Sequence, residues 1–159
     1  EDMFVFRGDA EVQKYNDDPF RNVGEARAFI RRLRDDYAAQ NSVAWGITLR
    51  GHDRMIGLCG FRDWDRRHNR AEIGYDLAKL YWRQGIGSEA VGVMLRFGFT
   101  RMNLNRVEAE AVLDNVGSVR LLEKQGFQRE GVRREFTLET DGKYLDDGVF
   151  GLLRSEYFK

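Results

Sequence analysis

The residues best suited to chemistry lie in a short glycine-containing segment, residues 82–88, with the sequence WRQGIGS. Gly85 and Gly87 have no β-carbon, so consecutive backbone N–H groups can come close to one anion. A helix expected from about Gly87 to Arg101 adds its unpaired first-turn N–H groups and about half a unit of positive charge. Together these features predict a seat for a pyrophosphate group.

Two better-known phosphate motifs do not fit this segment. The loop of nucleoside triphosphatases ends in Gly-Lys-Ser or Gly-Lys-Thr, and no such tripeptide follows Gly87. The dinucleotide-binding fingerprint needs a third glycine at position 90, which is Ala90, and no strand–helix–strand unit opens the chain. The segment therefore predicts a pyrophosphate ligand of a different kind.

A second motif spans residues 112–127, VLDNVGSVRLLEKQGF. Asn115 is suited to cap the N-terminus of a helix, and Gly126 supplies the left-handed residue that ends it. Leu121 and Leu122 fall on the face of this helix that would pack inward. These features predict a short helix from about Val116 to Gln125, whatever the function.

Both motifs resemble those of the GNAT superfamily of acetyl-CoA-dependent N-acetyltransferases. Gly85 and Gly87 match the loop Gln/Arg-x-x-Gly-x-Gly/Ala, although Trp82 stands where the first Gln or Arg is expected. Residues 115–127 match Asn-x-x-Ser/Ala-x-x-Leu-Tyr-x-Lys-x-Gly-Phe, with Leu122 in place of the tyrosine. The Tyr81-Trp82 pair is similar to the branch that includes the ribosomal-protein N-terminal acetyltransferases. The resemblance covers roughly residues 47–153.

The resemblance implies an α+β fold with one mixed, mostly antiparallel sheet flanked by helices, in which the strand ending near Leu77 splays from the strand at 106–112. The pantetheine arm of acetyl-CoA, the cosubstrate, would lie in this cleft against the backbone of residues 75–77. Arg83 and Gln84 would add side-chain donors at the pyrophosphate, and Lys124 would meet the nucleotide. The implied cofactor-binding residues are Tyr75, Asp76, Leu77, Arg83, Gln84, Gly85, Ile86, Gly87, Ser88, Asn115, Ser118 and Lys124.

The implied reaction is direct attack of a neutral primary amine on the thioester in a ternary complex. At pH 7, deprotonation costs about 4.6 kcal/mol for a lysine-type amine with a pKa near 10.4 but about 1 kcal/mol for a peptide α-amine near 7.8. Glu72 and Glu130 match glutamates used as general base in two branches, and the choice between them stays open, as does an ordinary ion pair for each. Many relatives use a tyrosine hydroxyl as general acid for the leaving thiolate, but this sequence has Leu122 at that position. Ser118 is therefore the expected hydrogen-bond donor to the thiolate.

The acceptor is expected to be the N-terminal α-amine of a protein or peptide. A small amine such as a polyamine, amino sugar or antibiotic is the alternative, and a non-catalytic acyl-CoA-binding sensor is a rival from another class. Acceptor pockets in this family come from the first helices and the final hairpin. Four acidic residues are candidates to bind a cationic amine, and each is also compatible with a plain surface charge: Asp17, Asp18, Glu135 and Asp146.

The remaining pattern predicts the elements that position these residues. An amphipathic helix is expected over 24–40, then a hairpin of 43–49 and 55–61, a strand over 71–77, and a closing hairpin of 137–140 and 144–153 around Asp141-Gly142. The strand that usually opens family members is not found in residues 1–6. With neither repeat nor low-complexity linker, residues 1–159 are expected to form a single N-acetyltransferase domain.

Composition excludes several classes of function. The 159 residues carry 26 Lys and Arg against 26 Asp and Glu, so no bulk charge favours nucleic acid or an anionic membrane. Only two histidines are present, which gives no imidazole cluster for a metal, and Cys59 is alone and expected to be buried and inert. No apolar run approaches the roughly 20 residues of a membrane helix. A cytoplasmic monomer or homodimer is expected.

Overall fold

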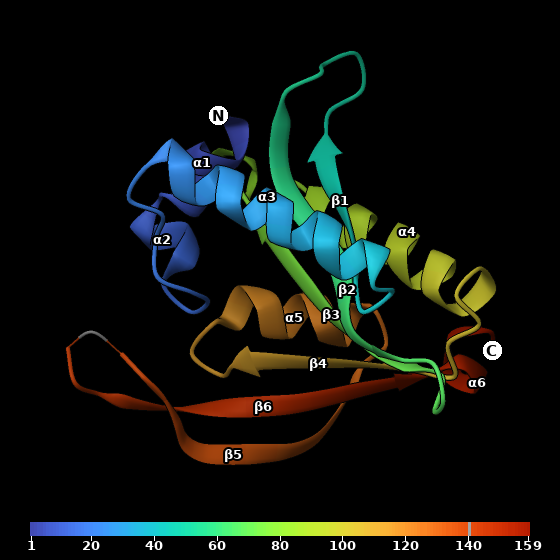
Figure 1. Ribbon diagram of the computed structural model, residues 1–159. Coiled ribbons are helices and arrows are strands. Elements are labelled where there is room, and N and C mark those ends of the chain that lie inside the picture. The colour runs from blue at the N-terminus through green and yellow to red at the C-terminus, as the bar shows by residue number, and fades with distance from the viewer. Residues whose placement is uncertain (140) are drawn as a thin grey trace.

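The computed structural model describes residues 1–139 and 141–159, and it places six strands in one open sheet in the order β1-β2-β3-β4-β6-β5. Every pair of neighbouring strands is antiparallel except β3 and β4. The sheet is flanked by helices (Figure 1), so the expected mixed, mostly antiparallel α+β fold is confirmed. The strands are β1 (Val43–Thr48), β2 (Met55–Asp65), β3 (Arg70–Leu77), β4 (Arg106–Val112), β5 (Gln128–Leu138) and β6 (Tyr144–Leu153). The helices are α1 (Asp2–Arg7), α2 (Ala10–Gln13), α3 (Val23–Ala38), the 3₁₀ helix η1 (Lys79–Tyr81), α4 (Ile86–Thr100), α5 (Val116–Lys124) and α6 (Arg154–Tyr157).

The two central strands separate partway along their length. β3 and β4 pair only through Arg70 with Arg106, Ala71 with Val107 and Glu72 with Glu108. Beyond that point β3 stays paired with β2 as far as Leu77, and β4 stays paired with β6 as far as Val112. The expected splay is therefore confirmed, and it leaves two unpaired strand edges facing each other.

The two faces of the sheet carry different helices. On one face α4 and α5 cover the main core, which includes Val91 and Leu95 of α4, Leu122 of α5 and Phe150 of β6. On the other face α1 and α3 cover a smaller cluster around Phe6. Side chains alternate between the two faces along each strand. Consecutive residues of β3, and likewise of β4, therefore point to opposite faces of the sheet where the strands separate.

Local signals account for the helix ends. The side chain of Asn22 accepts a hydrogen bond from the Glu25 N–H at 3.1 Å and starts α3. The side chain of Asn115 caps α5 in the same way through the Ser118 N–H at 3.2 Å. Gly126 follows α5 with a φ of 92°, which is the left-handed conformation that glycine adopts without steric cost. The expected cap and stop of α5 are confirmed.

The sequence prediction was wrong about the length of β5. The strand begins at Gln128, whereas only residues 137–140 were expected, and Thr140 lies outside the described residues. Nearly all of β5 is exposed, including Val132 and Phe136, because it is an edge strand paired only with β6. Its sequence therefore lacks the apolar alternation that identifies a half-buried strand.

The first residues also differ from the expectation. Residues 1–6 were assigned no element, but Asp2–Arg7 forms α1, whose Met3 and Phe6 are buried against α3 and the sheet. Asp2 accepts a hydrogen bond from the Met55 N–H at 3.0 Å, which ties α1 to the start of β2.

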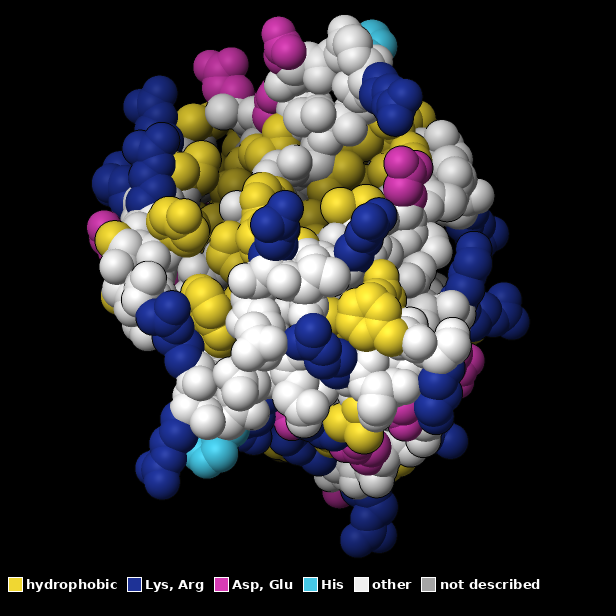
Figure 2. Space-filling model, turned by 90° about the vertical axis from the view of Figure 1, so that its right-hand side faces the viewer, with side chains coloured by type: hydrophobic (Ala, Val, Ile, Leu, Met, Phe, Trp, Pro, Cys, Tyr) yellow, Lys and Arg dark blue, Asp and Glu magenta, His cyan; other side chains and the backbone are white. Residues whose placement is uncertain are grey.

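The side of the molecule that is turned to the right in Figure 1 carries a hydrophobic hollow, and both basic and acidic side chains lie around its rim (Figure 2). On α4, Val93 and Phe97 are exposed, and Phe97 packs edge-on against Trp45 of β1 at a centroid distance of 5.0 Å.

No helix among the described residues is long and apolar enough to cross a membrane.

Candidate active site

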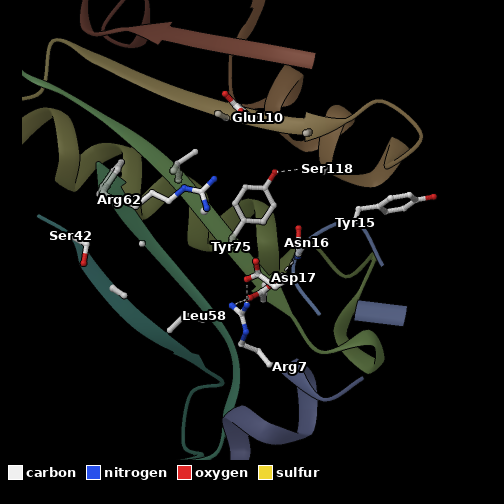
Figure 3. A pocket seen from close by; sticks show the side chains of 18 of the residues that line it. Arg7, Tyr15, Asn16, Asp17, Ser42, Leu58, Arg62, Tyr75, Glu110 and Ser118 are labelled. Carbon is white, nitrogen blue, oxygen red and sulfur yellow. Dashed lines mark hydrogen bonds and ion pairs between the residues drawn. The ribbon is translucent and has the colours of Figure 1, made fainter. Parts of the chain in front are cut away.

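A cavity of about 580 Å³ occupies the splay between β3 and β4. Tyr75 and Asp76 of β3 line it from one side, and residues 109–112 of β4 line it from the other. Asn115 and Ser118 reach it from the start of α5, and residues of α1, α3 and the α2–α3 loop close it on the opposite face of the sheet (Figure 3). The cavity therefore passes through the sheet at the place where the ladder is interrupted.

The glycine segment beside the cavity has the geometry of an anion seat. Arg83 and Gly85 have φ values of 58° and 83°, so the chain turns sharply there before α4 begins. Within the described residues, the backbone N–H groups of 83–88 donate to no protein acceptor. A β-carbon added at Gly85 would meet open space, which shows that the turn is accessible from solvent. An anion is the natural partner of so many free donors at a helix N-terminus.

Three side chains hold this segment in place. Trp82 donates from Nε1 to the Leu77 carbonyl at 2.6 Å, and Gln84 donates from Nε2 to the Leu80 carbonyl at 2.8 Å. Gln125, the residue after α5, donates from Nε2 to both the carbonyl and the hydroxyl of Ser88, each at 2.9 Å. Both motifs found in the sequence thus meet in space. Arg83 and Lys124, the two expected cationic ligands, are exposed.

Tyr75 and Ser118 face each other across the cavity. Their hydroxyl oxygens are 2.7 Å apart, and either can donate (Figure 3). Burial raises the pKa of Tyr75 to about 12, and the bond to Ser118 opposes this shift. Only the backbone of Tyr75 was expected to take part, so its hydroxyl is an addition to the predicted site. Leu122 is 1% exposed and packs in the core, so the hydroxyl that this helix position lacks has a counterpart on β3.

The two expected bases lie in ion pairs. Glu72 occupies the last paired position of β3, and its Oε1 accepts from Arg62 Nε at 3.1 Å. Burial raises the pKa of Glu72, and the bond from Arg62 opposes that effect. Glu130 accepts from Arg106 Nη1 at 2.8 Å, which lowers its pKa. Arg62 lines the cavity, but the cavity lining includes neither glutamate, and Glu130 lies at the end where the strands are still paired.

Three carboxylates that were not expected at the cavity line it, namely Asp36, Glu110 and Asp147. Glu110 of β4 lies at the cavity (Figure 3), and its Oε1 pairs with Arg133 Nη1 of β5 at 2.6 Å. Asp147 of β6 is 7% exposed, and its Oδ2 accepts from the Thr137 hydroxyl at 3.0 Å. Its Oδ1 is buried and has no hydrogen-bond partner within the described residues. Burial raises the pKa of Asp147, against the bond from Thr137, and the charge of Glu110 adds to the rise.

The acidic acceptor candidates are spread over different surroundings. Asp17 lines the cavity but is paired with Arg7. Asp18 and Glu135 are exposed and do not line it. Asp146 is exposed and accepts from the Glu135 N–H at 2.8 Å. The structure thus places Asp147, the neighbour of the candidate Asp146, in the cavity.

A buried polar cluster forms the wall of the cavity next to α1. Arg7 donates from Nη1 to Asp76 Oδ2 at 2.7 Å, and its guanidinium lies 4.4 Å from the centroid of the Phe29 ring. Asn16 donates from Nδ2 to Asp76 Oδ1 at 2.7 Å (Figure 3). Burial raises the pKa of Asp76, and the charge of Arg7 opposes the rise. These contacts fix the first two helices against the strand that the pantetheine arm is expected to follow.

Metal chemistry has no support from the arrangement of side chains. Among residues 1–139 and 141–159, no three His, Cys, Asp or Glu side chains gather where they could hold a metal ion. Cys59 is buried as expected, and burial raises its pKa to about 11, which keeps the thiol protonated. The chemistry of the cavity therefore rests on carboxylates, hydroxyls and guanidinium groups.

Comparison with known proteins agrees with this geometry. The acetyltransferase (GNAT) domain matches residues 1–128. An uncharacterized N-acetyltransferase, p20, of Bacillus licheniformis is 40% identical over 150 residues, covering 94% of this chain and 84% of that protein. The putative ribosomal N-acetyltransferase YdaF of Bacillus subtilis is 31% identical over 124 residues, covering 78% and 66%. Spermidine N-acetyltransferase from Vibrio cholerae, solved with CoA and spermine, superposes with a TM-score of 0.85 at 20% identity, covering 98% and 90%, which shows a shared fold.

Proposed function

The chain belongs to the GNAT family of acetyl-CoA-dependent N-acetyltransferases, and we propose that the amine it acetylates is the N-terminal α-amine of a polypeptide. The low pKa of an α-amine carries this proposal. The cavity lining holds five carboxylates and three guanidinium groups, and this small excess of negative charge suits a ligand end with one positive charge. A peptide brings one charge at its end and neutral amides behind it.

The energetics of the amine favour the same acceptor. Both glutamates that were expected to act as base are held by arginines, Glu72 by Arg62 and Glu130 by Arg106. An α-amine needs little help, because its deprotonation at pH 7 costs about 1 kcal/mol, against about 4.6 kcal/mol for an alkyl amine such as that of lysine. This difference corresponds to a factor of several hundred in the fraction of neutral nucleophile.

The residues present fit acetyl-CoA as cosubstrate. The free N–H groups of 83–88 suit its pyrophosphate, with Arg83 and Gln84 at the loop and Lys124 toward the nucleotide. The unpaired edge of β3 at residues 75–77 offers backbone groups to the pantetheine amides, as a partner strand would. Asn115 and Ser118 stand at the inner end, where the thioester supplies the acetyl group.

Ser118 is placed to stabilise the leaving sulfur. Its N–H is bound by Asn115 and its hydroxyl meets Tyr75, so the position of this side chain is fixed from two sides. Either hydroxyl can donate, and we assign the donor role to Tyr75 because a phenol is a stronger acid than an aliphatic alcohol, which leaves the serine proton free to point into the cavity. We assign to Ser118 the hydrogen bond to the developing thiolate and to Tyr75 the role of orienting it.

A small polyamine is the second candidate acceptor. Carboxylates outnumber guanidinium groups five to three among the charged residues of the lining, which favours cationic ligands in general. A spermidine N(1)-acetyltransferase of Vibrio cholerae is 23% identical over 142 residues, covering 89% of this chain and 79% of that protein. The alternative to an enzyme is a sensor that binds acyl-CoA without catalysing transfer.

The test compares acceptors that differ only in their amine. We would incubate the protein with acetyl-CoA and a peptide with a free α-amine, the same peptide blocked at its N-terminus but containing lysine, and spermidine. Thiol release and mass spectrometry report the rate and the site. We expect the free α-amine peptide to have the highest kcat/KM. Preference for spermidine would overturn the peptide assignment, and CoA binding without turnover on any acceptor would indicate a sensor.

A further inference from the structure

Asp147 is a carboxylate of the cavity lining in which one oxygen has no hydrogen-bond donor among the described residues. Only 7% of the residue is exposed, yet Oδ1 has no partner within the described residues, while Oδ2 is held by Thr137. A buried carboxylate oxygen without a hydrogen bond is costly, and such groups are rare unless a ligand or water completes them. The free oxygen therefore indicates a donor that arrives from the cavity.

The position of Asp147 follows from the register of three strands. It lies opposite Val112 of β4, two positions along the ladder from the pairing of Glu110 with Val149. Because the period of a strand is two, Asp147 shares its face with Glu110, on the side of the sheet away from α4 and α5. On β5 an irregularity between Arg133 and Thr137 brings the Thr137 hydroxyl onto Asp147.

We propose that Asp147 binds the acceptor ammonium through Oδ1 and accepts its proton, so that the amine can attack. This inference rests on the proposed acetylation of an amine. Three of the five carboxylates in the cavity lining, Asp17, Asp76 and Glu110, are in ion pairs. Among the described residues of the lining, only Asp147 combines the lack of an ion pair with a buried carboxylate oxygen that has no hydrogen-bond partner.

The charges around Asp147 are compatible with this role. Glu110 faces it from β4 and Arg133 faces it from β5, and Arg133 is itself paired with Glu110. Asp146 is the remaining charged neighbour, on the opposite face of the same strand. Burial and Glu110 both favour the protonated form of Asp147, which brings its pKa closer to that of an α-amine and makes the transfer less uphill.

The step balances without an added reactant. One N–H bond of the ammonium breaks and its proton goes to Asp147 Oδ1. The nitrogen lone pair then forms a bond to the acetyl carbonyl carbon while the carbon–sulfur bond breaks and its electron pair goes to sulfur. A second proton leaves the nitrogen and reaches the thiolate by way of solvent and the Ser118 hydroxyl. Asp147 returns its proton to water, and the products are the amide, the thiol and one proton.

The test compares two adjacent aspartates, Asp147→Asn and Asp146→Asn. Asn keeps the size and the acceptor oxygen, so Asp146→Asn should retain the bond from Glu135 and full activity. With a peptide bearing a free α-amine, we expect Asp147→Asn to lower kcat/KM at pH 7 at least about sevenfold, because only about one seventh of an amine with a pKa near 7.8 is neutral at that pH. The loss should shrink at alkaline pH, where the amine is already neutral, and CoA affinity measured by calorimetry should stay unchanged.

A third variant separates proton transfer from a structural role. Thr137→Val removes the hydrogen bond that lowers the pKa of Asp147, so the acidic limb of the pH–rate profile should move to higher pH. Glu72→Gln and Glu130→Gln, measured in the same pH–rate profile, compare Asp147 with the two glutamates that the sequence suggested as bases.

The outcomes separate the two proposals. If the wild-type protein acetylates no amine, the proposed function fails. If it does acetylate peptides but Asp147→Asn keeps kcat/KM, or loses it equally at every pH, then Asp147 is not the base. An unshifted acidic limb in Thr137→Val would also overturn the assignment.

Discussion

Replacing Tyr75 by phenylalanine tests whether the hydroxyl pair in the cavity acts in catalysis. The substitution removes one oxygen and keeps the ring that packs against the main core. Ser118 then loses its 2.7 Å partner, and its hydroxyl is free to rotate. The net loss of one such hydrogen bond is about 1 kcal/mol of folding stability. The catalytic loss should be larger, because Ser118 no longer presents its proton to the sulfur in a fixed direction.

We expect Tyr75→Phe to lower kcat about 10- to 100-fold, which corresponds to roughly 1.4–2.7 kcal/mol of transition-state stabilisation. The KM for acetyl-CoA should change little, since the pyrophosphate seat at 83–88 is untouched. Ser118→Ala should cost a similar amount, and the double variant should be no worse than the single variants, because the two hydroxyls act as one unit. Tyr157→Phe, whose ring packs on Phe99 in the core, is the matched control.

The assay has a readout that a structural defect would not move. The thiol of bound CoA can be titrated by the absorbance of its thiolate, and hydrogen bonds from Ser118 should lower the pKa of that thiol. Tyr75→Phe should raise it again by about one unit, or 1.36 kcal/mol. The reasoning is refuted if Tyr75→Phe leaves both kcat and the thiol pKa unchanged, or if the losses in Tyr75→Phe and Ser118→Ala multiply.

Three further predictions concern other parts of the site. Gly85→Val should weaken CoA binding at least tenfold by calorimetry, because a β-branched residue at a φ of 83° is strained and shields the free N–H groups. Gly142→Val, in the distant β5–β6 turn at a φ of 87°, is the control for strain alone. Glu130→Gln should change kcat less than twofold at pH 7, since its ion pair with Arg106 lies outside the cavity lining, and a large loss would return it to candidacy as base. Arg7→Met should lower the free energy of unfolding by about 3 kcal/mol in denaturant titration, because Asp76 is left buried without its countercharge.

The sequence predicted the cofactor side of the site better than the acceptor side. Gly85 and Asn115 act through backbone geometry, namely a tight turn and a helix cap, and such local features depend on residues a few positions away. The splay of β3 from β4 was expected from the family resemblance, and the ladder does stop after Glu72. The first hairpin, the central strands and the long helices carried a clear periodicity and were found close to where they were expected.

The acceptor side depends on contacts that no local pattern encodes. Asp146 and Asp147 are neighbours in a strand and must point to opposite faces, but which of them meets the cavity depends on the register of β6 with β4 and on the irregularity in β5. β5 itself gave little signal, because an exposed edge strand rich in arginine has no apolar face. Tyr75 was assigned a backbone role only, since nothing local indicates that a helix 43 residues later presents Ser118 to its hydroxyl.

The cavity divides the proton chemistry between the two faces of the sheet. Tyr75 and Ser118 belong to the face covered by α4 and α5, and Asp147 and Glu110 belong to the other. In the proposed reaction, a carboxylate on the side of the amine and hydroxyls on the side of the sulfur keep the proton acceptor away from the donors, so neither neutralises the other. Such a separation requires an opening through the sheet, and the interruption of the β3–β4 ladder after Glu72 provides it. Lengthening that ladder would therefore abolish turnover even if every named side chain were kept.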